Sequence, residues 1–200
     1  MKRFLIVILI ALSSVILYSG SSLSLLAGES ENPRVLIKTR MGDIAVEIFL
    51  KQAPITSGNF LKYVDAKLYD GTDFYRVVTL SNQPNNDIKI EVIQGGDVAD
   101  EKCFPNIEHE TTDKTRILHT DGAISMARGN PGTASCSFFI CINDQPQLNF
   151  GGKRNPDGQG FAAFGKVISG MEVVRKIQNQ PEEKQFLVKK VPILSISRIR

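Results

Sequence analysis

The chain has 200 residues, of which 42% are hydrophobic, enough for one domain with a sizeable core. Its 24 basic and 21 acidic residues leave a net charge of +3 and form no basic stripe, which argues against nucleic-acid binding. Sixteen glycines and nine prolines, with no tryptophan, favour a turn-rich β protein over a helical bundle.

The first 28 residues have the form of an export signal. Met1, Lys2 and Arg3 precede an apolar run, residues 4–18, that is interrupted only by two serines. The run can be extended to residue 26, and about 20 apolar residues suffice to span a bilayer. We therefore predict an exported protein, periplasmic or secreted, and membrane attachment through an uncleaved segment, residues 4–26, is the alternative. A polar linker, residues 29–34, then leads into a single domain, residues 35–200.

The first half of this domain is predicted to hold four strands and one helix. The strands are expected at residues 35–39, 44–49, 74–78 and 88–93. The first two alternate apolar and polar residues around a tight turn at Gly42, which is typical of a hairpin. A helix begins near Ala53, with Thr56 or Ser57 as its cap. Residues 79–87 are polar and rich in turn formers, so they indicate a loop.

The second half is predicted to add four strands and a second helix. These strands are expected at residues 122–127, 136–142, 161–167 and 191–199. The helix is expected at residues 171–178, whereas residues 97–121 are polar and show no clear element. Eight strands and two helices, joined by antiparallel-type turns, predict a mainly β fold: a closed barrel capped by helices, expected as a monomer.

The three cysteines are Cys103, Cys136 and Cys141. Cys136 and Cys141 lie five positions apart in one predicted strand, too far to bridge at about 3.3 Å per residue. Cys103 can pair with either of them, which leaves one thiol over. There is no Cys-x-x-Cys motif, and His109 and His119 are isolated, so no metal site is predicted.

Two predicted strands each carry one polar side chain within an apolar run. Alternation places Arg76 on the same face as Phe74 and Val78, and Gln94 on the same face as Val92. If the two strands are neighbours, Arg76 and Gln94 form a pair of hydrogen-bond donors beside a hydrophobic surface. An exposed arginine and an edge glutamine are the plainer alternative.

Seven motifs, in order along the chain, resemble the cyclophilin peptidyl-prolyl isomerases. They are Gly42-Asp43-Ile44, Ala53-Pro54-x-Thr56-x-x-Asn59-Phe60, Phe74-Tyr75-Arg76-Val77, Ile93-Gln94-Gly95-Gly96-Asp97, Ser125-Met126-Ala127, Ser137-Phe138-Phe139-Ile140 and Phe164-Gly165-Lys166-Val167. The resemblance covers about residues 35–199. It implies an eight-stranded antiparallel β-barrel capped by two helices, with the active site on one outer face and no cofactor or metal.

The resemblance also implies roles for individual residues. Arg76 is the expected catalytic arginine, and Gln94 is the amide that orients the substrate. The expected substrate-binding residues are Tyr75, Val92, Ala127, Arg128, Phe139, Leu148 and Phe161. Among them, Phe139 and Leu148 would form the walls of a proline pocket. The backbone at Ala127 and at the residue after it would pair with the bound peptide.

Several positions depart from the family pattern. Tyr75 replaces a histidine, Val92 falls where a pocket-lining aromatic–Met pair is usual, and Phe161 replaces a histidine or tyrosine. Gln147 stands where an aromatic residue is often found, and residues 79–90 form an insertion. We therefore predict weak cyclosporin binding and an altered peptide preference. The insertion is expected to be an extended hairpin or loop beside the groove that biases which peptides enter.

The predicted function is peptidyl-prolyl cis-trans isomerisation in exported polypeptides, that is, a folding catalyst whose partners are flexible, proline-containing chains. The barrier to rotation about an X-Pro bond arises from amide resonance, so a catalyst must stabilise the twisted amide. Arg76 is suited to this because it stays charged and presents fixed donors. A non-catalytic module that binds proline segments, or a chaperone, on the same barrel is the alternative.

Overall fold

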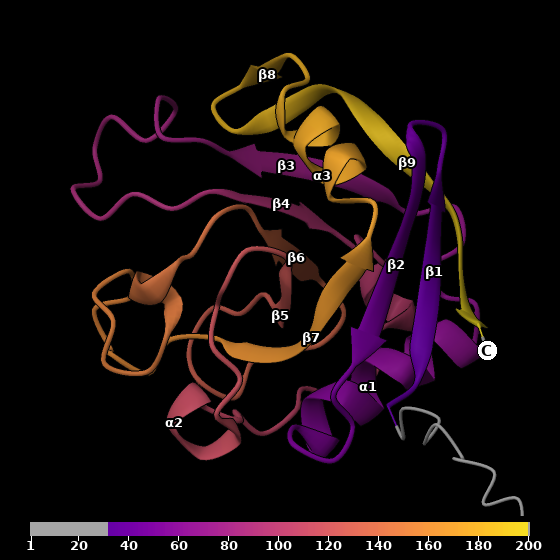
Figure 1. Cartoon of the computed structure of the whole chain (residues 1–200), viewed down its shortest axis with the longest axis horizontal. Coiled ribbons are helices and arrows are strands. Elements are labelled where there is room, and N and C mark those ends of the chain that lie inside the picture. The colour runs from indigo at the N-terminus through magenta and orange to yellow at the C-terminus, as the bar shows by residue number, and fades with distance from the viewer. Residues whose placement is uncertain (1–31, 200) are drawn as a thin grey trace, which may run out of the picture.

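The computed structural model describes residues 32–199, so the predicted signal at residues 1–28 lies outside them. The strands are β1 (Arg34–Thr39), β2 (Gly42–Ile48), β3 (Asp73–Val78), β4 (Val92–Gly95), β5 (Ala123–Met126), β6 (Phe138–Cys141), β7 (Ala162–Ser169), β8 (Glu182–Glu183) and β9 (Phe186–Ile199). They pair antiparallel in the order β1-β2-β7-β5-β6-β4-β3-β9, and a β1–β9 pairing closes the barrel (Figure 1). The prediction of a mainly β, closed eight-stranded barrel is confirmed, and β8 is a two-residue addition paired with β9.

Three α-helices accompany the barrel within residues 32–199. They are α1 (Pro54–Asp65), α2 (Thr112–Thr115) and α3 (Met171–Gln178), with short 3₁₀ turns η1 (Asp100–Lys102) and η2 (Pro146–Leu148). Figure 1 shows α1 and α3 at opposite ends of the barrel. The two predicted helices are α1 and α3, and α2 is an addition of a single turn, too short to produce a helical period in the sequence. None of these helices has the length and hydropathy needed to cross a membrane.

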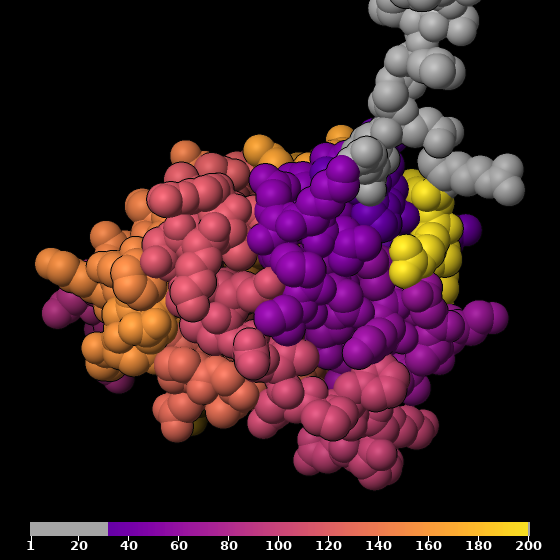
Figure 2. All heavy atoms as spheres, turned by 90° about the horizontal axis from the view of Figure 1, so that it is seen from below, coloured from indigo at the N-terminus to yellow at the C-terminus, as the bar shows by residue number. Residues whose placement is uncertain are grey.

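The start of α1 is stabilised from a distant part of the chain. Ala53 is its N-cap residue and makes no side-chain capping bond, so the predicted cap at Thr56 or Ser57 was wrong. Instead, the carboxylate of Glu110 accepts the backbone N–H groups of Ile55 and Thr56 at 3.2 and 2.6 Å. An anion satisfies orphan donors there and complements the helix dipole. Figure 2 shows the segment after β4 packed beside α1.

Strand alternation separates the barrel interior from a smaller apolar cluster on its outer face. Phe138 is fully buried in the interior, where its ring meets Phe60, Tyr69 and Phe74 edge-on. Phe139, the next residue, belongs to the outer cluster. That cluster consists of Val78, Ile90, Val92, Ala123, Phe139, Cys141 and Leu148. The wall of the barrel therefore carries a second hydrophobic surface, and the candidate site lies on it.

Candidate active site

A small cavity of about 120 Å³ opens on this outer surface. Its lining residues are Arg76, Ile90, Val92, Gln94, Ala127, Arg128, Phe139, Leu148 and Phe161. Eight of these nine are predicted site residues; Ile90 is the addition. Cavities for drug-sized ligands measure roughly 300–1,000 Å³, so this one has room for a single small apolar group.

Sheet register places the key side chains in one row. Arg76 on β3 pairs with Gln94 on β4, and Gln94 pairs with Phe139 on β6. Ser125 on β5 then pairs with Phe139 from its other side. The β4 strand ends at Gly95, one residue after Gln94, and the next residue, Gly96, adopts a φ of +78°. A Cβ at Gly96 would lie 2.9 Å from two ring carbons of Phe138, so only glycine fits.

The guanidinium of Arg76 is held by two glutamines. One N–H of its NH1 group donates to Gln94 Oε1 at 2.8 Å. Its Nε and NH2 groups donate to Gln185 Oε1 at 3.1 and 2.5 Å. Burial lowers the pKa of Arg76, yet its partners are neutral amides, so the positive charge is not cancelled. Gln185 was missed in the sequence because it lies in a turn 109 positions away.

Tyr75 supports the site from behind. Gln94 Nε2 donates to the Tyr75 hydroxyl at 2.6 Å, which fixes the orientation of the Gln94 amide toward Arg76. The hydroxyl in turn points at Ser137 Oγ, 3.4 Å away. Burial raises the pKa of Tyr75, so its phenol stays protonated at neutral pH. The structure places Tyr75 outside the cavity lining, unlike its predicted role as a substrate-binding residue. The register of β3 shifts between Phe74 and Arg76, so the prediction that these two share a face was wrong: Phe74 lies in the barrel interior, whereas Arg76 lines the outer cavity.

Aromatic rings form one side of the cavity. The Phe139 and Phe161 rings meet edge to face with centroids 5.3 Å apart, and the Arg128 guanidinium lies 5.1 Å from the Phe161 centroid. Arg128 is also bound to both carboxylate oxygens of Asp157, at 2.8 and 3.0 Å, and this pair holds the Asp157 pKa at about 2. The Arg128 side chain is therefore held by contacts within the protein, to Asp157 and Phe161.

A buried histidine supports Phe139. The His119 ring stacks on Phe139 with centroids 6.0 Å apart, and only 1% of the residue is exposed. Its ring nitrogens contact Asn149 Oδ1 at 2.8 Å and Ser125 Oγ at 3.0 Å. Because an amide oxygen only accepts, Nδ1 carries the proton and Nε2 accepts from Ser125. Burial lowers the His119 pKa to about 4, so the ring is neutral. No spacing in the sequence indicated this contact.

The insertion at residues 79–90 is a loop rather than a hairpin, since the structure assigns no strand there. Figure 1 shows it as the long connection between β3 and β4. The buried Gln83 side chain holds it together by donating to Thr79 O at 2.6 Å and Ile90 O at 2.8 Å. Its last residue, Ile90, lines the small cavity, so the insertion contributes directly to the site.

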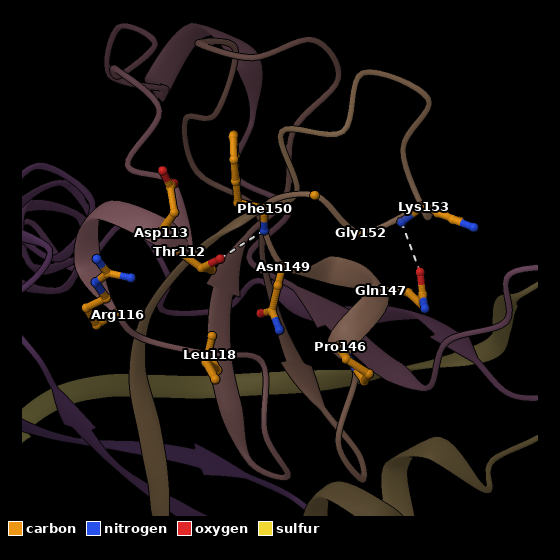
Figure 3. A pocket seen from close by; sticks show the side chains of 11 residues that line it. Thr112, Asp113, Arg116, Leu118, Pro146, Gln147, Asn149, Phe150, Gly152 and Lys153 are labelled. Carbon is orange, nitrogen blue, oxygen red and sulfur yellow. Dashed lines mark hydrogen bonds between the residues drawn. The ribbon is translucent and has the colours of Figure 1, made fainter.

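A larger hollow of about 560 Å³ lies between α2 and residues 146–153. Figure 3 shows its lining, including Thr112, which accepts the Phe150 N–H at 2.9 Å. None of the predicted site residues lines it. The smaller cavity is the better candidate because charged donors and an apolar wall converge there. No cluster of three or more His, Cys, Asp or Glu side chains suited to a metal ion occurs in residues 32–199.

The sequence and the fold both match known proteins. The family described as cyclophilin type peptidyl-prolyl cis-trans isomerase/CLD matches residues 34–198. A peptidyl-prolyl cis-trans isomerase of Acinetobacter baylyi is 36% identical over 166 residues, covering 80% of each chain. Peptidyl-prolyl cis-trans isomerase B of Escherichia coli is 31% identical, covering 79% of this chain and 92% of its own.

Solved structures agree with these relatives. The crystal structure of a cyclophilin type peptidyl-prolyl cis-trans isomerase from Cryptosporidium parvum has a TM-score of 0.64 at 25% identity. The match covers 84% of this chain and 98% of the chain of the Cryptosporidium parvum protein. A second structure of that protein, with a TM-score of 0.62, was obtained in the presence of the dipeptide Ala-Pro.

Proposed function

The chain belongs to the cyclophilin-type peptidyl-prolyl cis-trans isomerases, and from this premise we propose that it is an exported folding catalyst in which Arg76 stabilises the twisted X-Pro amide. The single observation that carries the mechanism is the fixed position of the Arg76 guanidinium at the edge of an apolar cavity. The isomerase activity is that of the family. The catalytic role of Arg76 and the exported location are proposals.

The guanidinium retains donors for a substrate. An arginine has five N–H groups, and three of those of Arg76 are used in bonds to Gln94 and Gln185. In the hydrogen bonds among residues 32–199, one N–H on NH1 and one N–H on NH2 are therefore not used. As the X-Pro bond twists, resonance is lost and the proline nitrogen regains its lone pair. A donor at that nitrogen favours the twisted state over either planar state, which is what lowers the barrier.

The apolar cavity supplies the fixed point for this rotation. Its small volume suits one pyrrolidine ring, held between Phe139, Leu148 and Phe161. With the ring held, the carbonyl of the preceding residue is the part that swings. The Ala127 N–H already donates to Ser137 O at 2.9 Å, so the backbone of the next residue, Arg128, is the proposed partner for the peptide on that side. Proline-containing flexible chains are accordingly the proposed partners.

Export rests on the N-terminal sequence alone. The basic residues and the apolar run at residues 4–18 support secretion, and residues 4–26 support retention in the membrane as the alternative. Expressing the whole chain in a bacterial host, fractionating the cells and sequencing the N-terminus of the product decides between them. A protein that stays in the cytoplasm with Met1 intact contradicts export.

The mechanism is tested by following cis-to-trans relaxation of a short X-Pro peptide with the protein and with Arg76→Ala. We expect the substitution to lower kcat/KM by about 10²–10³-fold, as for loss of a preorganised donor elsewhere. Arg76→Lys should recover part of the loss, because lysine keeps the charge and lacks the planar fork.

Equal thermal stability of the variants is required for this comparison. Activity that is unchanged in Arg76→Ala would place the catalytic group elsewhere. A well-folded protein that does not accelerate relaxation would favour the non-catalytic binding module.

A further inference from the structure

A second cavity, of about 290 Å³, adjoins the proline cavity and shares only Arg76 with it. The rest of its lining consists of Arg154, Gln185 and residues 82–86 of the insertion. Except for one proline, all of these side chains are polar, and none is a carboxylate. The insertion has therefore built a polar chamber directly beside the expected catalytic arginine.

The chamber holds two positive charges. Arg154 donates from NH1 to Gln83 Oε1 at 2.8 Å and to Ile88 O at 2.6 Å, and both of these acceptors are neutral. No ion pair of the described residues includes Arg76 or Arg154. Both guanidiniums line the same cavity, and burial together with the nearby charge of Arg76 lowers the pKa of Arg154. In the hydrogen bonds among residues 32–199, each of them keeps N–H groups that are not used.

Sheet order tells which end of a peptide reaches this chamber. The strands of the site run in the order β5-β6-β4-β3-β9. Ala127 follows β5, Arg76 lies on β3, and Gln185 lies beyond it, beside β9. The chamber and Ala127 thus lie on opposite sides of the proline cavity. The residues before the proline are expected to pair on the Ala127 side. The residues after the proline would pass Arg76 and enter the chamber.

We propose that this chamber is a carboxylate subsite, which selects substrates that carry an acidic side chain or a free chain end shortly after the proline. Guanidinium groups bind carboxylates through paired, charge-assisted hydrogen bonds, and no protein carboxylate lines the chamber to compete. The inference rests on the proposed isomerase function, since it assumes that the proline ring occupies the neighbouring cavity.

Four peptides test the subsite. Three have amidated ends and carry Glu, Gln or Lys two positions after the proline, and the fourth carries Gln and a free terminal carboxylate. We expect kcat/KM for the Glu peptide to exceed that for the Gln peptide about fivefold, the size of a partly exposed ion pair, with the Lys peptide lowest.

The salt dependence tests whether the preference for Glu is electrostatic, and the fourth peptide tests whether a chain end can supply the carboxylate. The preference for Glu should shrink as ionic strength rises from about 0.01 M to about 1 M, where the Debye length falls from about 30 to about 3 Å. A high kcat/KM for the fourth peptide identifies the chain end as a carboxylate source. A low value restricts the subsite to acidic side chains.

Substitutions at Arg154 test whether this residue causes the preference for the Glu peptide. Arg154→Gln should bring the Glu-to-Gln ratio close to one, and Arg154→Lys should keep part of it because the charge remains. Arg175→Gln is the matched control: Arg175 lines neither cavity and pairs with Asp121 at 2.9 Å, so the ratio should not change. Equal kcat/KM for the Glu and Gln peptides in the parent protein would overturn the subsite while leaving the isomerase intact.

Direct binding separates this proposal from the proposed function. Fluorescence anisotropy with labelled Glu and Gln peptides reports the subsite even if neither peptide is isomerised faster. Tighter binding of the Glu peptide without turnover would support the subsite and contradict the isomerase. Equal binding of both would overturn the subsite whatever the activity.

Discussion

Arg76 and Gln185 are 109 positions apart in the chain, yet a single amide oxygen of Gln185 accepts two hydrogen bonds from the Arg76 guanidinium. Gln185 lies in the tight turn between β8 and β9, where it and Lys184 both have left-handed backbone angles, with φ of 76° and 50°. Non-glycine residues rarely adopt such angles. The turn holds the oxygen in place, and the oxygen fixes the plane of the guanidinium.

Gln185→Gly is expected to lower kcat about 3–10-fold, because it removes both hydrogen bonds from Gln185 to the charged guanidinium and leaves Gln94 alone to hold Arg76. Glycine suits the positive φ, so unfolding stability should not fall. Relaxation kinetics and a urea titration measure the two quantities. Lys184→Gly alters the same turn without touching Arg76 and is the control. Equal losses of kcat in both variants would attribute the effect to the turn.

Stability is expected to fall between pH 6.5 and pH 4 because His119 is buried in its neutral form. Its folded pKa is lowered to about 4, so the unfolded chain binds the proton more readily throughout this range. The stabilisation is complete above pH 6.5 and is lost as pH falls toward 4, by about 3 kcal/mol. Burial also lowers the pKa of His109, which adds to the trend in the same direction.

His119→Gln should flatten this pH dependence, whatever its effect on stability at neutral pH. Urea midpoints measured at pH 7, 6, 5 and 4.5 give the slope for the parent and the variant. His109→Gln provides the comparison, because this partly buried residue stacks on no site residue. If the slope is as steep in His119→Gln as in the parent, the buried histidine is not its source.

Cys103 is expected to form a disulfide with Cys136 rather than with Cys141. The Cys103 and Cys136 sulfurs lie 3.0 Å apart, whereas Cys141 lies at the end of β6 and is buried in the outer cluster. In exchange with glutathione disulfide, the two cysteine thiols would give two electrons to the glutathione disulfide. This forms the Cys103–Cys136 bond and releases two glutathione thiols. Burial raises the pKa of Cys136 to about 11, so exchange should be slow at neutral pH.

Peptide mapping after incubation in a glutathione redox buffer identifies the linkage. The chain-entropy model gives roughly 4 kcal/mol for closing a loop of this length, so the oxidised protein should unfold at higher urea. Cys141→Ser should form the same bond, and Cys136→Ser should form none. Linkage through Cys141 would contradict the prediction.

Cyclosporin should bind weakly, with a dissociation constant well above the nanomolar range. The aliphatic side chains of Ile90 and Val92 line the cavity beside Phe139, where the family pattern leads one to expect an aromatic residue. Gln147 belongs to the neighbouring hollow and presents an amide in place of an aromatic ring. Calorimetric titration measures the affinity, and replacing Val92 with Phe should raise it. Nanomolar binding by the parent would show that these substitutions do not matter.

Local patterns predicted most of the barrel, because strands in antiparallel sheets alternate faces and end at turn residues. The family resemblance, rather than alternation, predicted that Arg76, Gln94 and Phe139 form one site. Alternation placed Phe74 on the Arg76 face, which was wrong because the register of β3 shifts between these two residues. It could not predict Gln185 or His119, since contacts across many residues depend on tertiary packing and leave no period in the sequence. It also could not show that Glu110 caps α1, because a carboxylate supplied from 54 positions away follows no capping motif.

The pairing of Arg34 with Ile199 brings the two ends of the domain to one point of the barrel. Joining them with a short linker should therefore create a circular permutant, and the insertion at residues 79–90 offers a place for new termini. Because the two ends meet where β1 pairs with β9, a partner protein fused to either end of the domain would be joined at the same corner of the barrel.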